Sequence, residues 1–208
     1  MFRLYRQPNP NEFFVCGADP AEGNDYCAAQ WVSKGTQEVI LTFQARMESS
    51  QFGYELYKGS QLIYNTARVW PVIGVERNTG QATIARLLDL NYPALYRHTD
   101  TGNPDAVEEK KIGWPTNTGT RPMMLDDLAL AIRQGVLHVY DKPTLKEMLS
   151  FIRHPKTGKP EAEQGTHDDL VMSLAIAWQL YTRVPTPDTN AQPLIQEAPQ
   201  LFSSDGFY

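Results

Sequence analysis

The sequence predicts an α/β protein with a central mixed β-sheet flanked by helices. Its N-terminal part contains three short apolar runs joined by tight connections, a pattern typical of an antiparallel meander. Segments with helical and with strand periodicity then alternate along the chain, which is the order expected of an α/β fold. With 208 residues, of which 41% are hydrophobic, the chain can bury the core of one domain of ordinary size.

The meander is predicted from three apolar runs bounded by turn residues. Gly23-Asn24 separates the first run from the second, and Lys34-Gly35 separates the second from the third. We therefore expect strands at Phe13 to Ala18, Tyr26 to Ser33 and Glu38 to Ala45.

Helices and strands are expected to alternate after the meander. Ser49 and Ser50 are suitable residues to begin a helix that reaches about Asn65. The apolar run from Val69 to Val75 is typical of a buried strand. The remaining predicted elements are a helix from Thr79 to Leu90, strands at Ala94 to His98 and Val136 to Tyr140, helices at Met123 to Arg133 and Thr144 to Phe151, a hairpin tip at Arg153 to Pro160 and a helix from Asp168 to Tyr181.

One domain followed by a tail is the expected organisation. Residues 1–183 contain all the predicted helices and strands. Residues 184–208 contain four prolines, three acidic residues and no Lys or Arg, which indicates a flexible acidic C-terminal tail.

Composition excludes some classes of function. Nineteen Lys and Arg against twenty-four Asp and Glu give 19 − 24 = −5, so the chain cannot bind polyanions through bulk charge, and any contact with nucleic acid must be local. Cys16 and Cys27 lie in apolar surroundings, which favours buried free thiols and a reducing cytosol. No apolar stretch reaches the roughly 18 residues of a membrane span, and the N-terminus does not resemble a signal peptide.

Four acidic residues lie where strands end or a helix begins. Asp19 ends the first strand, Glu76 ends the Val69 to Val75 strand, and Asp168 and Asp169 open the last helix. If the two strands are neighbours, these carboxylates meet at one edge of the sheet, where they repel one another unless a cation lies among them. Ligands that are all oxygen favour Mg²⁺ or Mn²⁺. Two such ions about 4 Å apart can drive phosphodiester hydrolysis.

Each acidic residue also has a purely structural interpretation. Asp19-Pro20 can start a turn, and Glu76 can be a surface residue at the end of a strand. Thr166 can cap the last helix with Asp169 at its third position, which would leave Asp168 freer to bind metal. A shift of one residue in the start of the helix would reverse the roles of the two acids.

Four motifs in order resemble the nuclease domain of terminase large subunits. They are Gly17-Ala18-Asp19-Pro20-Ala21-Glu22-Gly23 with Asp25, Gly74-Val75-Glu76-Arg77-Asn78, Lys111-Ile112-Gly113-Trp114-Pro115-Thr116-Asn117 and Gly165-Thr166-His167-Asp168-Asp169-Leu170-Val171. The resemblance covers roughly Phe13 to Tyr181. It implies the RNase H-like fold that resolvases and integrases share, with Asp19, Glu76, Asp168 and Asp169 as catalytic metal ligands and His167 as a possible neighbour of the site.

The resemblance also implies an activity, cofactors and partners. The expected activity is that of a DNA endonuclease, a phosphodiester hydrolase with two Mg²⁺ or Mn²⁺ ions, which cuts concatemeric viral DNA during genome packaging. The expected partners are double-stranded DNA, a terminase ATPase domain, the small terminase subunit and the portal protein, in the cytoplasm of an infected bacterium and without a membrane. No G-x-x-x-x-G-K-[ST] sequence is present, so either the chain is an excised nuclease domain or its motor is a separate chain. We expect an excised domain.

Basic residues near the motifs could bind DNA phosphates. Arg77 adjoins Glu76, and Arg153, Lys156 and Lys159 precede the last helix; Lys110, Lys111 and Arg121 are further candidates. Two alternatives remain open. A Holliday-junction resolvase or transposase-like enzyme would use the same fold and metal chemistry, and a nuclease-inactive module would dock on a portal or motor.

Overall fold

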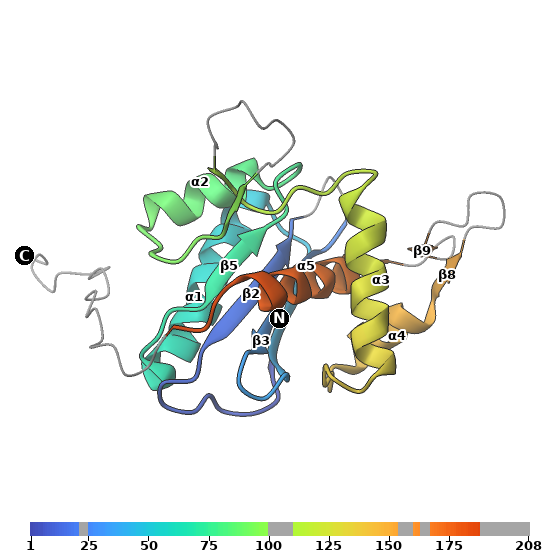
Figure 1. Cartoon of the computed structure of the whole chain (residues 1–208). Helices are drawn as coiled ribbons and strands as arrows, with labels where there is room; N and C mark the ends of the chain where they lie inside the picture. The colour runs from blue at the N-terminus through green and yellow to red at the C-terminus, as the bar shows by residue number, and fades with distance from the viewer. Residues whose placement is uncertain (21–24, 100–109, 154–159, 163–166, 188–208) are drawn as a thin grey trace, which may run out of the picture.

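The computed structural model of the chain is an α/β fold built around a five-stranded sheet (Figure 1). It describes residues 1–20, 25–99, 110–153, 160–162 and 167–187. The elements in chain order are β1 (Phe2–Leu4), β2 (Phe14–Asp19), β3 (Cys27–Ser33), β4 (Val39–Ala45), α1 (Ser49–Ala67), β5 (Val72–Val75), α2 (Gln81–Asp89), β6 (Arg97–Thr99), β7 (Lys110–Ile112), α3 (Thr120–Arg133), α4 (Lys142–Leu149), β8 (Phe151–Arg153), β9 (Pro160–Ala162) and α5 (Asp169–Arg183).

The central sheet is mixed, as predicted, with strand order β1-β4-β3-β2-β5. β2, β3 and β4 form the predicted antiparallel meander. β5 returns through the crossover that contains α1 and lies parallel to β2, with Ala18 opposite Val75. The carboxyl ends of β2 and β5 therefore lie at the same edge of the sheet.

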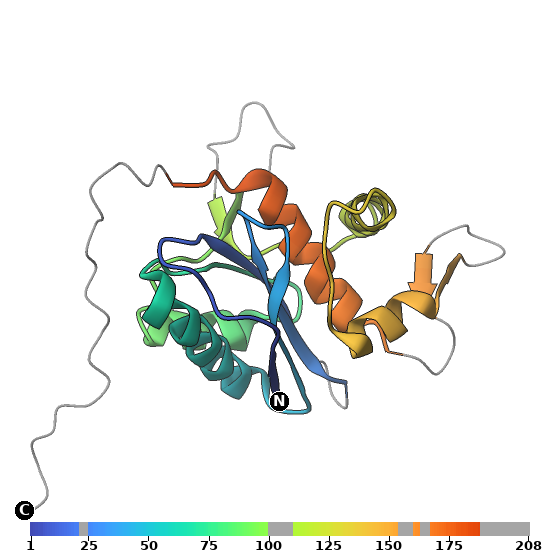
Figure 2. The same cartoon turned by 90° about the horizontal axis from the view of Figure 1, so that it is seen from below.

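Helices cover both faces of the sheet. Figures 1 and 2 show α1 and α2 on one face and α5, with α3 beside it, on the other. Side chains alternate along β2 because successive residues of a strand point to opposite faces. Phe14, Cys16 and Ala18 pack in the apolar cluster under α1 and α2, whereas Val15 packs in the cluster under α5 and α3. Cys16 and the second cysteine, Cys27, are buried and free, as predicted.

Two predicted strands differ from the structure. The segment Val136 to Tyr140 forms only an isolated bridge, between His138 and Glu38. The reason is that β1, which was not predicted, pairs with β4 from Leu41 to Phe43 and occupies that edge of the sheet. The segment Ala94 to His98 is divided. Leu95 bridges to β5, and the chain then enters β6, which pairs with β7.

The remaining predictions agree with the structure to within a few residues. α3 begins at Thr120 rather than Met123, and α4 begins at Lys142 rather than Thr144. β8 and β9 pair antiparallel, with Arg153 opposite Pro160, on either side of the predicted hairpin tip; residues 154–159 of that tip lie outside the described residues. The predicted tail lies outside the described residues from position 188 onward. None of the helices in the described ranges combines the length and the apolar character needed to cross a membrane.

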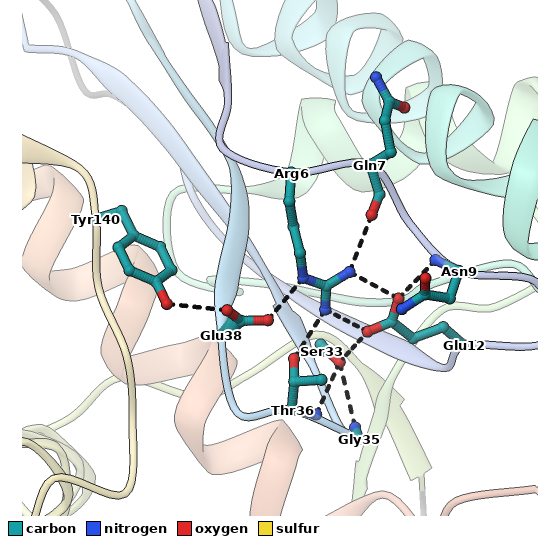
Figure 3. Close-up of polar contacts among 9 residues, drawn as sticks. All are labelled: Arg6, Gln7, Asn9, Glu12, Ser33, Gly35, Thr36, Glu38 and Tyr140. Atoms are coloured by element: carbon teal, nitrogen blue, oxygen red, sulfur yellow. Dashed lines mark hydrogen bonds and ion pairs between the residues drawn. The ribbon is translucent and has the colours of Figure 1, made fainter.

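A polar network joins the chain segments at the end of the sheet opposite Asp19 (Figure 3). Arg6 donates to the carboxylates of Glu12 and Glu38, and Tyr140 donates to Glu38 over 2.9 Å. Glu12 precedes β2 and Glu38 precedes β4, so the guanidinium of Arg6 connects the starts of two strands. The functional acids considered next lie at the other end of β2.

Candidate active site

Asp19 and Glu76 lie side by side because β2 and β5 are parallel neighbours. The register places Ala18 opposite Val75. Asp19 and Glu76, which follow these two residues, are therefore neighbours at the sheet edge. The backbone N–H of Glu76 donates to the carbonyl of Ala18 over 2.8 Å, which fixes this juxtaposition. The condition on which the predicted site depended, that the two strands are adjacent, is therefore met.

Glu76 is held by contacts on both sides. It is 8% exposed, and the hydroxyl of Thr79 donates to its Oε2 over 2.7 Å. The motif that contains Trp114 lies along the free edge of β5: the N–H of Trp114 donates to Val75, and the N–H of Arg77 donates to Trp114. This third motif therefore extends the sheet edge beside Glu76 and is part of the site's framework.

Helix α5 crosses the sheet in direct contact with β2. A Cβ atom at Gly17 would lie 2.1 Å from the carbonyl oxygen of Ser173 and 2.3 Å from the backbone nitrogen of Ala177, so only glycine allows this approach. Ser173 is one helical turn after Asp169, and this turn brings the start of α5 toward the end of β2. Gly17 thus places the helix that carries the last acidic pair.

The start of α5 differs from the predicted one. The helix begins at Asp169, with Asp168 as its N-cap residue, and the Asp168 side chain makes no capping hydrogen bond. Thr166 lies outside the described residues and two positions before the N-cap. Asp169 is the first helical residue, which contradicts the alternative in which Thr166 caps the helix and Asp169 occupies its third position.

The four predicted acids interact with one another through their charges. Burial of Asp19 raises the pKa of its carboxyl well above the usual value, and the negative charges of Glu76, Asp169 and Asp168 raise this pKa further. The positive charge of Arg121 acts in the opposite direction. Three segments that are far apart in sequence thus place their carboxylates close enough to repel one another.

Asp169 faces the same cost of burial and repulsion. Burial is the main cause that raises the pKa of Asp169 to about 6, and the charges of Asp168 and Asp25 add to the effect. His167 lowers it, since its Nδ1 lies 3.7 Å from Asp169 Oδ2. His167 also packs edge-on against the ring of Tyr26. A role for His167 in the site stays a prediction.

The structure describes only some of the predicted DNA-binding residues. Arg77 directly follows Glu76 at the sheet edge, and Arg153 ends β8 in the hairpin before α5. Lys156 and Lys159 lie outside the described residues. Arg121, near the start of α3, reaches the acidic cluster itself: its Nη2 lies 2.7 Å from Asp168 Oδ2.

The cluster has the chemistry of a site for a hard divalent cation. Its donors are carboxylate oxygens, and Asp169 Oδ2 is buried without a hydrogen bond from any described residue. A cation among the acids would reverse the repulsion that raises their pKa values. Within the described ranges, no three acidic, His or Cys side chains are close enough to form a preformed metal cage. The type of donor atom, rather than a preformed cage, is therefore what fits a hard divalent cation.

Two further acidic residues lie near the cluster. Asp25, which the first motif includes but to which the sequence analysis gave no site role, is exposed and contributes charge to Asp169. Sequence reasoning missed the second residue, Glu147. Glu147 comes from α4, and its Oε2 accepts a hydrogen bond from the backbone N–H of Leu170 over 2.9 Å. No sequence signal links Glu147 to the start of α5, because only the packing of α4 against α5 brings them together.

Comparison with known proteins identifies the fold. No family model matches the sequence. One solved structure with a similar fold is the large terminase nuclease from thermophilic phage G20c with bound magnesium, at 19% identity over 88% of this chain and 87% of that chain, with a TM-score of 0.66. The large terminase nuclease domain of Thermus phage P74-26 is 18% identical over 90% of this chain and 89% of that chain, with a TM-score of 0.66. The human cytomegalovirus terminase nuclease domain is 14% identical over 81% of this chain and 82% of that chain, with a TM-score of 0.54. The phage G20c nuclease has also been solved with bound cobalt. The chain has the fold of terminase large-subunit nuclease domains, which confirms the predicted RNase H-like fold.

Proposed function

We propose that this chain is the nuclease of a terminase large subunit. It would be a metal-dependent endonuclease that cuts concatemeric viral DNA, in which genome copies are joined end to end, during genome packaging. The observation that carries the proposal is the convergence of Asp19, Glu76, Asp168 and Asp169 from three separate segments onto one sheet edge. Buried carboxylates that repel one another are unfavourable for stability alone, so their arrangement is best explained by a bound cation.

The four acids would hold one or two Mg²⁺ or Mn²⁺ ions. Bound there, the metal would supply an acidified water and charge stabilisation for hydrolysis of a phosphodiester. Magnesium in the phage G20c nuclease supports this choice of ion. The strand ends fix the backbone of Asp19 and Glu76, and the hydroxyl of Thr79 orients the Glu76 carboxylate. Asp168 and Asp169, at the start of α5, would supply the remaining carboxylates.

Basic residues around the cluster would hold the DNA backbone. Arg77 and Arg121 lie beside the acids, and the hairpin that begins with Arg153 precedes α5; Lys156 and Lys159 belong to the same basic segment of the sequence. Contacts of this kind position a duplex without reading its sequence. A few local contacts suit a chain whose net charge is negative.

The proposed setting is the packaging machinery of a virus in an infected bacterium. An ATPase domain, the small terminase subunit and the portal protein are the partners that the family resemblance implies. Similarity of the fold to two phage terminase nucleases supports this setting.

Plasmid cleavage tests the proposal. The purified chain should nick or linearise supercoiled plasmid with Mn²⁺ or Mg²⁺ and should stop when EDTA is added. Glu76→Gln should be inactive, because it loses a charged ligand of nearly the same shape. Glu55→Gln, which changes a carboxylate on α1, is the matched control and should cleave as the wild type does. Equal cleavage in EDTA, or full activity of Glu76→Gln, would contradict the proposal. Strong preference for a four-way junction over linear duplex would instead identify a resolvase.

A further inference from the structure

The first turn of α5 takes its capping carboxylate from another helix. The N–H groups in the first turn of a helix lack partners within the helix and need acceptors, which the N-cap side chain usually provides. Here Asp168, the N-cap residue, makes no such hydrogen bond. Glu147 Oε2 accepts from the N–H of Leu170 over 2.9 Å and lies 3.4 Å from the nitrogen of Val171.

We propose that Glu147 is a positioning residue that caps α5 in place of its own acids and so leaves Asp168 and Asp169 available to bind metal. This inference rests on the proposed function, because it concerns the ligands of that same site. An acid that caps its own helix would have an oxygen committed to backbone N–H groups. The Asp168 side chain makes no capping hydrogen bond, although its Oδ2 is paired with Arg121, with which a metal ion would compete. Asp169 Oδ2 accepts no hydrogen bond from the described residues.

Both oxygens of Glu147 are engaged in holding the helix start. While Oε2 accepts from α5, Oε1 lies 3.2 Å from Nε2 of Gln44, the donor at the end of β4. The carboxylate therefore connects the sheet, α4 and α5. These contacts favour a positioning role over a role as a fifth acidic ligand.

The helix that carries Glu147 is itself anchored at its other end. Asp141 is the N-cap of α4 and accepts from the N–H of Thr144 over 2.8 Å. The buried side-chain amide of Gln30, from β3, lies 3.1 Å from the hydroxyl of Thr144 and donates to the carbonyl of Leu170 over 2.7 Å. β3 thus fixes α4 relative to the first turn of α5, which holds Glu147 within hydrogen-bonding distance of the N–H of Leu170.

Hydrogen exchange and calorimetry on the whole chain test the inference. In metal-free Glu147→Ala the amides of Leu170 and Val171 should exchange at least about tenfold faster than in the wild type, because their hydrogen-bond acceptor is gone. The affinity for Mn²⁺, measured by titration calorimetry, should fall by about 10- to 100-fold, as is typical when a residue that orients a metal ligand is lost. Glu147→Gln should restore most of both properties, since its amide oxygen can accept the same hydrogen bonds.

A control separates this role from a general loss of stability. Ser60→Ala removes the acceptor of the Trp31 indole N–H on the far face of the sheet, so it should destabilise the chain without changing either measurement. Wild-type exchange at Leu170 and Val171 in Glu147→Ala would show that there is no cap. Wild-type Mn²⁺ affinity in that variant would overturn the positioning role alone. A wild-type chain that binds no Mn²⁺ would overturn the proposed function, and the role of Glu147 with it.

Discussion

The guanidinium of Arg121 and the carboxylate of Asp168 form an ion pair, with 2.7 Å between Nη2 and Oδ2, that joins the start of α3 to the start of α5. Both side chains are about one-third exposed, so the pair contributes little to stability. The ion pair matters for the charge of the cluster, because Arg121 places a positive charge beside four carboxylates. In the proposed enzyme, a metal ion and Arg121 would compete for the same oxygen.

Replacing Arg121 should strengthen metal binding. Arg121→Gln removes the competing cation and increases the negative potential at the acids, so the dissociation constant for Mn²⁺ should fall about fivefold, equivalent to about 1 kcal/mol. Titration calorimetry at low ionic strength measures this directly. Arg133→Gln, at the other end of α3, is the control and should leave the affinity unchanged. A weaker affinity in Arg121→Gln would mean that Arg121 helps to hold the ligand rather than competes for it.

Removing a repelling acid should abolish cleavage without destabilising the metal-free protein. Asp19→Asn loses a buried charge that the other acids oppose, so its melting temperature without metal should equal or exceed that of the wild type. Cleavage should fall by about 100-fold or more, a barrier change of roughly 3 kcal/mol. Mn²⁺ should raise the melting temperature of the wild type more than that of the variant. A clear loss of stability in the metal-free variant would assign Asp19 a structural role.

Gly17→Ala should displace α5. Its Cβ atom would overlap backbone atoms of Ser173 and Ala177, which cannot rotate away, so we expect a loss of about 3 kcal/mol or more in the free energy of unfolding. Cleavage should fall as well, because the same helix carries two of the acids. Gly35→Ala is the matched control, because its Cβ atom would lie 3.8 Å from Ser33 Oγ, an ordinary contact; it should change stability by less than about 0.5 kcal/mol. Urea unfolding of the two variants gives the comparison.

Asp141 should make stability depend on pH in the acid range. Burial alone would raise the pKa of this carboxyl, but hydrogen bonds from Arg3, Tyr5 and Thr144 outweigh burial and lower it to about 2, from an ordinary value of 3.8. Because the folded-state pKa is the lower one, the stabilisation is present above about pH 4 and is lost as the pH falls toward 2. The expected loss is about 2 kcal/mol.

Comparison with Asp141→Asn isolates this contribution. The asparagine does not titrate, so the difference in unfolding free energy between the wild type and the variant should shrink by about 2 kcal/mol between pH 6 and pH 2. Denaturant titrations at a series of pH values measure it. A constant difference across that range would show that the carboxylate of Asp141 is not preferentially stabilised in the folded chain.

The sequence was sufficient to predict the elements whose pattern is local. The meander, the strand that ends at Glu76 and the helix that begins near Asp168 were visible in apolar periodicity and turn residues. It was insufficient where two segments compete for one partner. Val136 to Tyr140 has a strand-like pattern, yet β1 takes most of the edge of β4 that this segment would need. The outcome of such competition depends on which strand pairing is more stable in the folded protein, and this cannot be predicted from a local sequence pattern.

By itself, the sequence determined which carboxylates could form a metal site, because the ends of strands and the start of a helix can be predicted from local sequence patterns. Only the tertiary structure decided how they are held. The parallel pairing of β2 with β5 places Asp19 beside Glu76, and the close approach of α5 at Gly17 brings Asp169 to them. Glu147 became visible only through the packing of α4, because hydrogen bonds between residues far apart in sequence depend on the whole fold rather than on any segment.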